Sequence, residues 1–69
     1  MLKKRSFTLS GHRTSVALET EFWATLETHA RVTKSSLAAL VARIDESRGE
    51  RPLASALRVF ALKHTLAEK

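Results

Sequence analysis

The 69-residue sequence contains no cysteine, which excludes disulfide bonds and thiolate metal sites. Its three histidines, His12, His29 and His64, are too scattered to replace cysteine as ligands. A chain this short buries only about 60% of its unfolded surface, so a lone domain would be marginally stable. We therefore expect self-association to supply the missing stability.

Long apolar runs are also absent. No segment approaches the ~18 to 20 apolar residues that a membrane-spanning helix needs. The basic start at Lys3, Lys4 and Arg5 is followed by Phe7–His12, which is no apolar core of a signal peptide. We expect a cytoplasmic protein that does not contact a membrane.

The sequence has none of the motifs of common enzyme classes. The histidines do not occur at HxxxH or HExxH spacing, and no glycine-rich loop precedes a Lys-Ser or Lys-Thr pair. Asp45 and Glu46 stand without a second acidic pair nearby. We therefore expect no enzyme, no cofactor and no metal site.

Positive charge is in excess. Twelve Lys and Arg against seven Asp and Glu give a formal net charge of +5, which a homodimer would double. Such a charge attracts a polyanion, although a basic surface can also simply keep a small protein in solution. A hydrophobic content of 43% favours a folded chain over a disordered basic tail.

The first third of the chain favours β-strand. Thr14, Val16 and Leu18 alternate with Arg13, Ser15 and Ala17, so that one face is apolar and the other faces outward. A single strand cannot form a sheet. Either the run at residues 7–9 folds back across residues 10–12, or the strand pairs with a second chain.

Three helices are expected after the strand. Apolar residues recur at helical spacing in each, and the starts are marked by Glu19 and Glu21, by the capping residue Ser36 and by Pro52. No glycine separates the first two helices, so Thr33 or Lys34 has to adopt the left-handed conformation. The predicted single domain, residues 1–69, has a strand region at 6–18 and helices at about 19–32, 36–48 and 53–67.

This order of a strand, a helix, a tight turn and a second helix resembles the ribbon-helix-helix fold of the Arc and methionine repressors. The resemblance to a short bacterial subfamily of unknown target extends over roughly Lys3 to His64. It rests on the segments Lys4–Ser6, Gly11–Val16, Phe22–Trp23, Ile44–Asp45 and Ser55–Phe60.

The resemblance implies a mostly α, α+β homodimer. Its intermolecular antiparallel β-ribbon enters the DNA major groove. To this fold the chain adds a third C-terminal helix and, if residues 7–9 fold back, an extra N-terminal strand. If residues 7–9 flank the central ribbon, the dimer has four strands at ~4.8 Å spacing, which is too wide for simple entry into a groove of ~12 Å.

The resemblance also implies site residues. Those reading bases are Arg13, Ser15 and Ala17. Those binding phosphate are Lys34, Ser36, Leu37 and Ala38 at the start of the second helix, with Lys3, Lys4 and Arg5 as a flexible arm.

The function implied is a sequence-specific regulator, expected to be a repressor, whose partners are double-stranded DNA and a second copy of itself. Two alternatives remain open. One is the antitoxin of a toxin–antitoxin pair, disfavoured because no disordered tail follows the third helix. The other is a dimeric module that does not bind DNA and docks a protein partner on its C-terminal helix.

Overall fold

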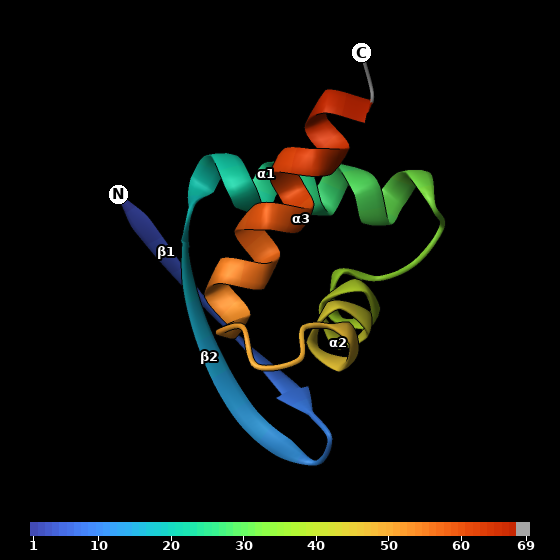
Figure 1. The fold of residues 1–69 in the computed structure, drawn as a ribbon. Coiled ribbons are helices and arrows are strands. Elements are labelled where there is room, and N and C mark those ends of the chain that lie inside the picture. The colour runs from blue at the N-terminus through green and yellow to red at the C-terminus, as the bar shows by residue number, and fades with distance from the viewer. Residues whose placement is uncertain (68–69) are drawn as a thin grey trace.

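The computed structural model describes residues 1–67, which form a β-hairpin followed by three helices (Figure 1). The predicted helices lie within one residue of the observed ones, and the mostly α, α+β fold class is confirmed. No helix in residues 1–67 is long and apolar enough to cross a membrane. The elements are β1 (Leu2–Leu9), β2 (His12–Glu19), α1 (Thr20–Val32), α2 (Leu37–Ser47) and α3 (Leu53–Ala67).

The two strands pair antiparallel within one chain, from Leu9 opposite His12 to Leu2 opposite Glu19. The loop between them has only two residues, Ser10 and Gly11, with φ values of 52° and 81°. Positive φ at both positions is the type I′ geometry, whose twist matches that of the flanking strands. Residues 7–9 therefore supply the second strand of the sheet, and no partner chain is needed for it.

The first strand is longer than predicted, and this corrects one expectation. Lys3, Lys4 and Arg5 belong to β1 and do not form a flexible arm. The prediction was wrong because three consecutive cations have low intrinsic strand propensity. Their β conformation comes from pairing with Leu18, Ala17 and Val16 on β2, which is a tertiary interaction.

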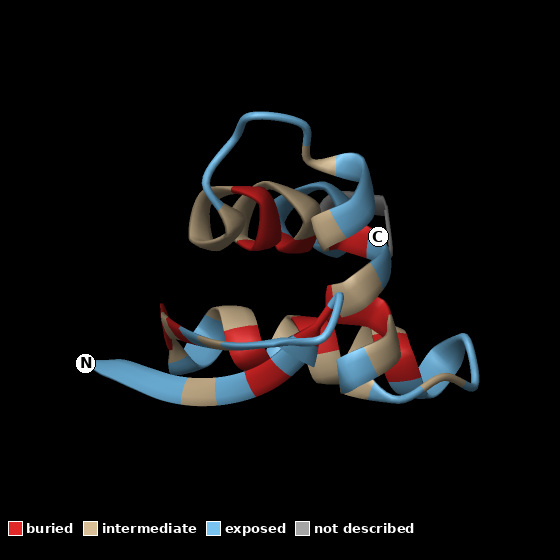
Figure 2. Cartoon of the chain, turned by 90° about the horizontal axis from the view of Figure 1, so that it is seen from below, coloured by how far each residue is buried: buried red, intermediate tan, exposed pale blue. Residues whose placement is uncertain are grey.

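The hydrophobic core draws side chains from every strand and helix. From Arg5 to Leu9, exposed residues of β1 alternate with more buried ones, as Figure 2 shows, so that each strand turns one face toward the helices. The largest fully buried side chains are those of Trp23, Leu18, Leu26, Leu40, Leu57 and Val41.

The connections between helices follow the local sequence. Lys34 adopts the left-handed conformation after α1, with φ 59°, as one of the two residues predicted to do so. Ser36 caps α2 by accepting a hydrogen bond of 3.0 Å from the amide of Ala39. Gly49, with φ 62°, follows the end of α2.

The third helix is an integral part of this fold, because it packs against α1, α2 and β2. The Arg58 guanidinium on α3 donates hydrogen bonds of 3.0 and 3.3 Å to the two carboxylate oxygens of Glu19, where β2 meets α1. This pair joins the last helix to the end of the hairpin.

Candidate nucleic-acid interface

The hairpin presents one polar face away from the helices. Directly opposed residues of an antiparallel pair share a face, and the register pairs Lys4 with Ala17, Ser6 with Ser15 and Thr8 with Arg13. Five of these residues are exposed and Ala17 is half-buried. We call this surface the ribbon face; it consists of Lys4, Ser6, Thr8, Arg13, Ser15 and Ala17.

The opposite face of the hairpin fixes this orientation. Phe7 and Leu9 on β1, and Val16 and Leu18 on β2, are at most 8% exposed. A slip of β2 by one residue relative to β1 would turn Val16 and Leu18 into solvent and bury Arg13. The outward placement of Arg13 and Ser15 that alternation predicted thus follows from burial of the apolar set.

Hydrogen bonds on the ribbon face run between the two strands. The hydroxyls of Ser6 and Ser15 lie 2.9 Å apart, and Nη1 of Arg13 donates to Oγ1 of Thr8 at 3.5 Å. No carboxylate of the described residues forms an ion pair with Arg13. Its guanidinium can therefore donate to an external acceptor, such as O6 and N7 of guanine.

Sequence reasoning gave no role to two residues of this face, Ser6 and Thr8. Lys4 was predicted to bind phosphate, but as part of a flexible arm. The sequence does contain a signal for this part of the face. Lys4, Ser6 and Thr8 are polar residues at every second position ahead of Ser10–Gly11, and this two-residue loop brings them beside β2.

The structure separates the three basic residues of β1. Lys4 lies on the ribbon face, whereas Arg5 forms an ion pair with Glu27 on α1 and lies 5.2 Å from the centre of the Trp23 ring. The backbone carbonyl of Lys3 accepts a hydrogen bond from Trp23. Arg5 is therefore engaged by α1, and Lys4 is the member of the three that lies exposed on the same face as Arg13.

The start of α2 forms a second candidate surface. Lys34, Ser36 and Ala38 are exposed, and Leu37 is half-buried. As the first two residues of the helix, Leu37 and Ala38 have amide groups without an intrahelical acceptor. The first turn of α2 contains no acidic residue, so no carboxylate on it competes for the positive end of the helix dipole.

Capping and anion binding use different amide groups at this terminus. The Ser36 hydroxyl is occupied by the amide of Ala39, which leaves those of Leu37 and Ala38 for a phosphate. Lys34 stands two residues before the cap, so its positive charge would complement an anion bound at these amides. Because α2 also packs against β1, this terminus is fixed relative to the hairpin.

Comparison with known proteins gives one match. A family model described as a ribbon-helix-helix domain matches residues 2–65, which include both strands, α1, α2 and nearly all of α3. Neither the curated proteins nor the solved structures give a match.

Proposed function

This chain belongs to the ribbon-helix-helix family of DNA-binding regulators, and from that premise we propose that it is a homodimeric, sequence-specific transcriptional repressor. It acts by occupying an operator in double-stranded DNA. We further propose that it works in the cytoplasm and has no catalytic activity. The fold predicted from the sequence resemblance agrees with the family match over residues 2–65.

The observation that carries the proposal is the composition of the ribbon face. Arg13 projects without a carboxylate partner among the described residues, beside the small side chains of Ser15 and Ala17. Small side chains allow a strand to approach base edges closely, while an arginine reaches into the major groove and donates two hydrogen bonds to guanine. Arg13 is thus the main reader, Ser15 a weaker one, and Ala17 packs against a thymine methyl.

Dimerisation through β2 is favoured by the free edges of the hairpin. The register that pairs Leu9 with His12 turns the backbone groups of Arg13, Ser15 and Ala17 away from β1, and no bond from another element to the backbone of β2 occurs among the described residues. An unpaired strand edge is a template for another chain. We infer that two β2 strands pair antiparallel near Ser15 and bring two copies of Arg13 onto one surface.

The resulting sheet has four strands and needs a specific placement on DNA. Four strands at ~4.8 Å spacing exceed the ~12 Å width of the major groove. The central β2 pair therefore lies over the groove, and each β1 lies over a flanking phosphate backbone. Lys4 and the hydroxyls of Ser6 and Thr8 would then contact phosphates.

The α2 terminus supplies a further phosphate contact. Lys34, Ser36 and the amides of Leu37 and Ala38 would hold a phosphate without reading sequence, which sets the register of the ribbon on the duplex. Arg13 then determines which sequence is preferred, and Lys34 adds affinity to every sequence.

Selection from a randomised duplex pool at ~150 mM salt tests this function. The expected product is an inverted repeat, because a two-fold dimer reads two half-sites. Arg13→Ala should lose about 1 to 3 kcal/mol of discrimination at one position of each half-site, whereas Lys34→Ala should weaken binding to all sequences alike. Lys63→Ala on α3 is the matched control for loss of one positive charge and should change affinity least.

The salt dependence of binding distinguishes phosphate contacts from base contacts. The log–log slope of affinity against salt should fall by about 0.9 for each phosphate contact removed, as in Lys34→Ala. A folded dimer that enriches no sequence, and in which Arg13 matters no more than Lys63, would contradict the proposal. That result would direct attention to α3 as a surface for a protein partner.

The proposed dimer has its own test, since the chain contains no cysteine. Ser15→Cys on β2 should cross-link rapidly with a short bismaleimide, because the two copies of residue 15 would lie near the two-fold axis. Ser6→Cys on the outer strand is the control and should cross-link poorly. Equal reaction of both variants would contradict pairing through β2.

A further inference from the structure

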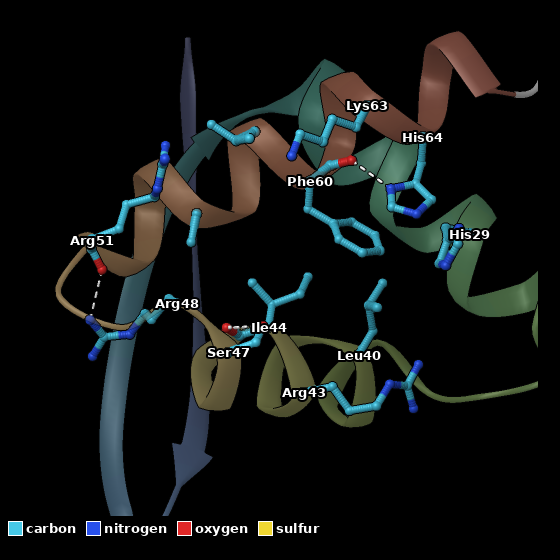
Figure 3. Close-up of a pocket in the computed structure, with 12 residues that line it drawn as sticks. His29, Leu40, Arg43, Ile44, Ser47, Arg48, Arg51, Phe60, Lys63 and His64 are labelled. Carbon is cyan, nitrogen blue, oxygen red and sulfur yellow. Dashed lines mark hydrogen bonds between the residues drawn. The ribbon is translucent and has the colours of Figure 1, made fainter.

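A hollow of about 500 Å³ lies between α2 and α3, away from the residues assigned to DNA (Figure 3). We call it the α2–α3 groove. Sites for small organic ligands commonly have volumes of about 300 to 1,000 Å³ and combine an apolar surface with a few polar groups.

The floor of the groove is apolar. Leu40 and Ile44 of α2 and Phe60 of α3 point into it, and Ala56 and Val59 complete its α3 side. Leu40, Ile44 and Ala56 are buried, whereas Phe60 and Val59 remain half-exposed. A ligand with an apolar body would cover these two side chains.

The rim of the groove is cationic. Arg43, Arg48, Arg51 and Lys63 line it, and no acidic residue does. Arg48 is held by Asp45 at 2.7 Å and by the carbonyl oxygen of Arg51 at 2.8 Å. Among the described residues, no carboxylate forms an ion pair with Arg43, Arg51 or Lys63.

One end of the groove is an aromatic wall. The Phe60 and His64 rings stack with centroids 3.8 Å apart, and the His29 ring meets His64 edge-on at 4.5 Å. Nδ1 of His64 donates to the carbonyl oxygen of Phe60 at 2.8 Å, because a carbonyl can only accept. Nε2 of His64 is then left as an acceptor, or as a donor when the ring is protonated.

We propose that the α2–α3 groove binds a small organic anion that has a flat aromatic body and one carboxylate or sulfonate group. The aromatic body packs between Phe60 and Ile44, and the acidic group meets Arg43 and Lys63. A second copy of the chain is a poorer occupant of this groove, because a surface of a chain with more cations than carboxylates does not complement the cationic rim. This site is independent of the proposed DNA contacts.

A matched pair of fluorescent probes tests the inference without DNA. 1-Anilinonaphthalene-8-sulfonate carries the sulfonate, and N-phenyl-1-naphthylamine has the same aromatic body without it. We expect the sulfonate probe to bind about tenfold more tightly, the value of one charge-assisted hydrogen bond. Amide chemical shifts on titration should change most at Ile44, Val59 and Phe60.

Charge-removing variants locate the contact. Arg43→Gln and Lys63→Gln should each weaken the sulfonate probe several-fold and leave the neutral probe unchanged. Arg31→Gln, which removes an exposed cation that does not line the groove, is the control and should change neither affinity. Circular dichroism and urea titration of each variant establish that it is folded.

Three results would overturn the proposal. The first is equal binding of both probes. The second is a dimer that covers the groove and leaves the amides of Ile44, Val59 and Phe60 unshifted. The third is that duplex DNA displaces the sulfonate probe, and that Arg43→Gln and Lys63→Gln weaken DNA binding as strongly as Lys34→Gln does. This result would assign the groove to DNA.

Discussion

Nε1 of Trp23 on α1 donates a hydrogen bond of 2.8 Å to the backbone carbonyl oxygen of Lys3 on β1. The same indole lies 5.9 Å from the Phe7 ring and 5.2 Å from the Arg5 guanidinium, measured between centres. One buried side chain therefore holds the length of β1 against the first helix. This arrangement makes the basic N-terminal segment part of the folded domain.

Replacing Trp23 by Phe should show how much the hydrogen bond to Lys3 contributes to the free energy of unfolding. The substitution removes the indole donor to the Lys3 carbonyl and part of a ring that is only 2% exposed, so we expect a loss of about 2 kcal/mol in the free energy of unfolding. Urea denaturation measures it. Lys3→Ala is the control, because it retains the backbone carbonyl and should cost little. Similar losses in both variants would contradict this role for Trp23.

The helices were predictable because their signals are local. Apolar spacing, the Ser36 cap and Pro52 each act within a few residues, and the observed ends agree with the predicted ones to within one residue. The extent of β1 was not predictable in this way. Lys3, Lys4 and Arg5 are extended because β2 and Trp23 hold them, and neither is adjacent in sequence.

The candidate site residues also divide into those set by local sequence and those set by contacts between distant segments. Arg13 and Ser15 were predicted from the alternation of a single strand, and their outward position is as expected. Lys4 was predicted as a phosphate contact on a flexible arm, but its place beside Ala17 required the pairing of two strands. The α2–α3 groove required the packing of two helices, which a reading of each segment alone does not give.

The hairpin loop offers a test of the intrachain strand pairing. Ser10 has φ 52°, a region that costs a residue with a Cβ about 1 kcal/mol and that asparagine tolerates better. Ser10→Asn should raise the free energy of unfolding by on the order of 0.5 kcal/mol, and Ser10→Val should lower it by about 1 kcal/mol. Urea denaturation measures both. If the strands paired only between chains, the two substitutions would have nearly equal effects.

The ion pair between Arg58 and Glu19 predicts a pH dependence. Hydrogen bonds from Arg58, followed by one from the backbone amide of Glu19, hold the pKa of the Glu19 carboxyl below its ordinary value of 4.5. The carboxyl thus stabilises the fold above its unfolded pKa, and this stabilisation is lost as pH falls through the lower, folded pKa. The effect should be small, since both side chains are more than a third exposed.

A carboxyl carbon NMR titration measures this pKa directly. Arg58→Gln should raise the pKa of Glu19 toward 4.5, because it removes the charged donor. Arg43→Gln, which removes a positive charge from α2, is the control and should leave the Glu19 titration in place. A Glu19 midpoint that does not respond to Arg58→Gln would show that the pair does not persist in solution.

At position 34, folding stability favours a residue without a Cβ, whereas the proposed DNA binding requires the positive charge of Lys34. Its φ of 59° is unfavourable for a residue with a Cβ, and glycine would relieve the strain. Lys34→Gly should therefore raise the free energy of unfolding by about 1 kcal/mol. The same change removes the cation beside the free amides of α2, so affinity for all DNA sequences should fall.

Two further variants separate these effects. Lys34→Asn should keep part of the conformational gain and lose the charge, whereas Lys34→Arg should keep the charge and the strain. Urea denaturation gives stability, and fluorescence anisotropy with labelled duplex DNA gives affinity. We expect the affinity for DNA to depend on the positive charge at position 34, and the free energy of unfolding to depend on how well the residue there tolerates a positive φ. A Lys34→Gly protein that is more stable and binds DNA as tightly as the original would show that Lys34 contacts no phosphate.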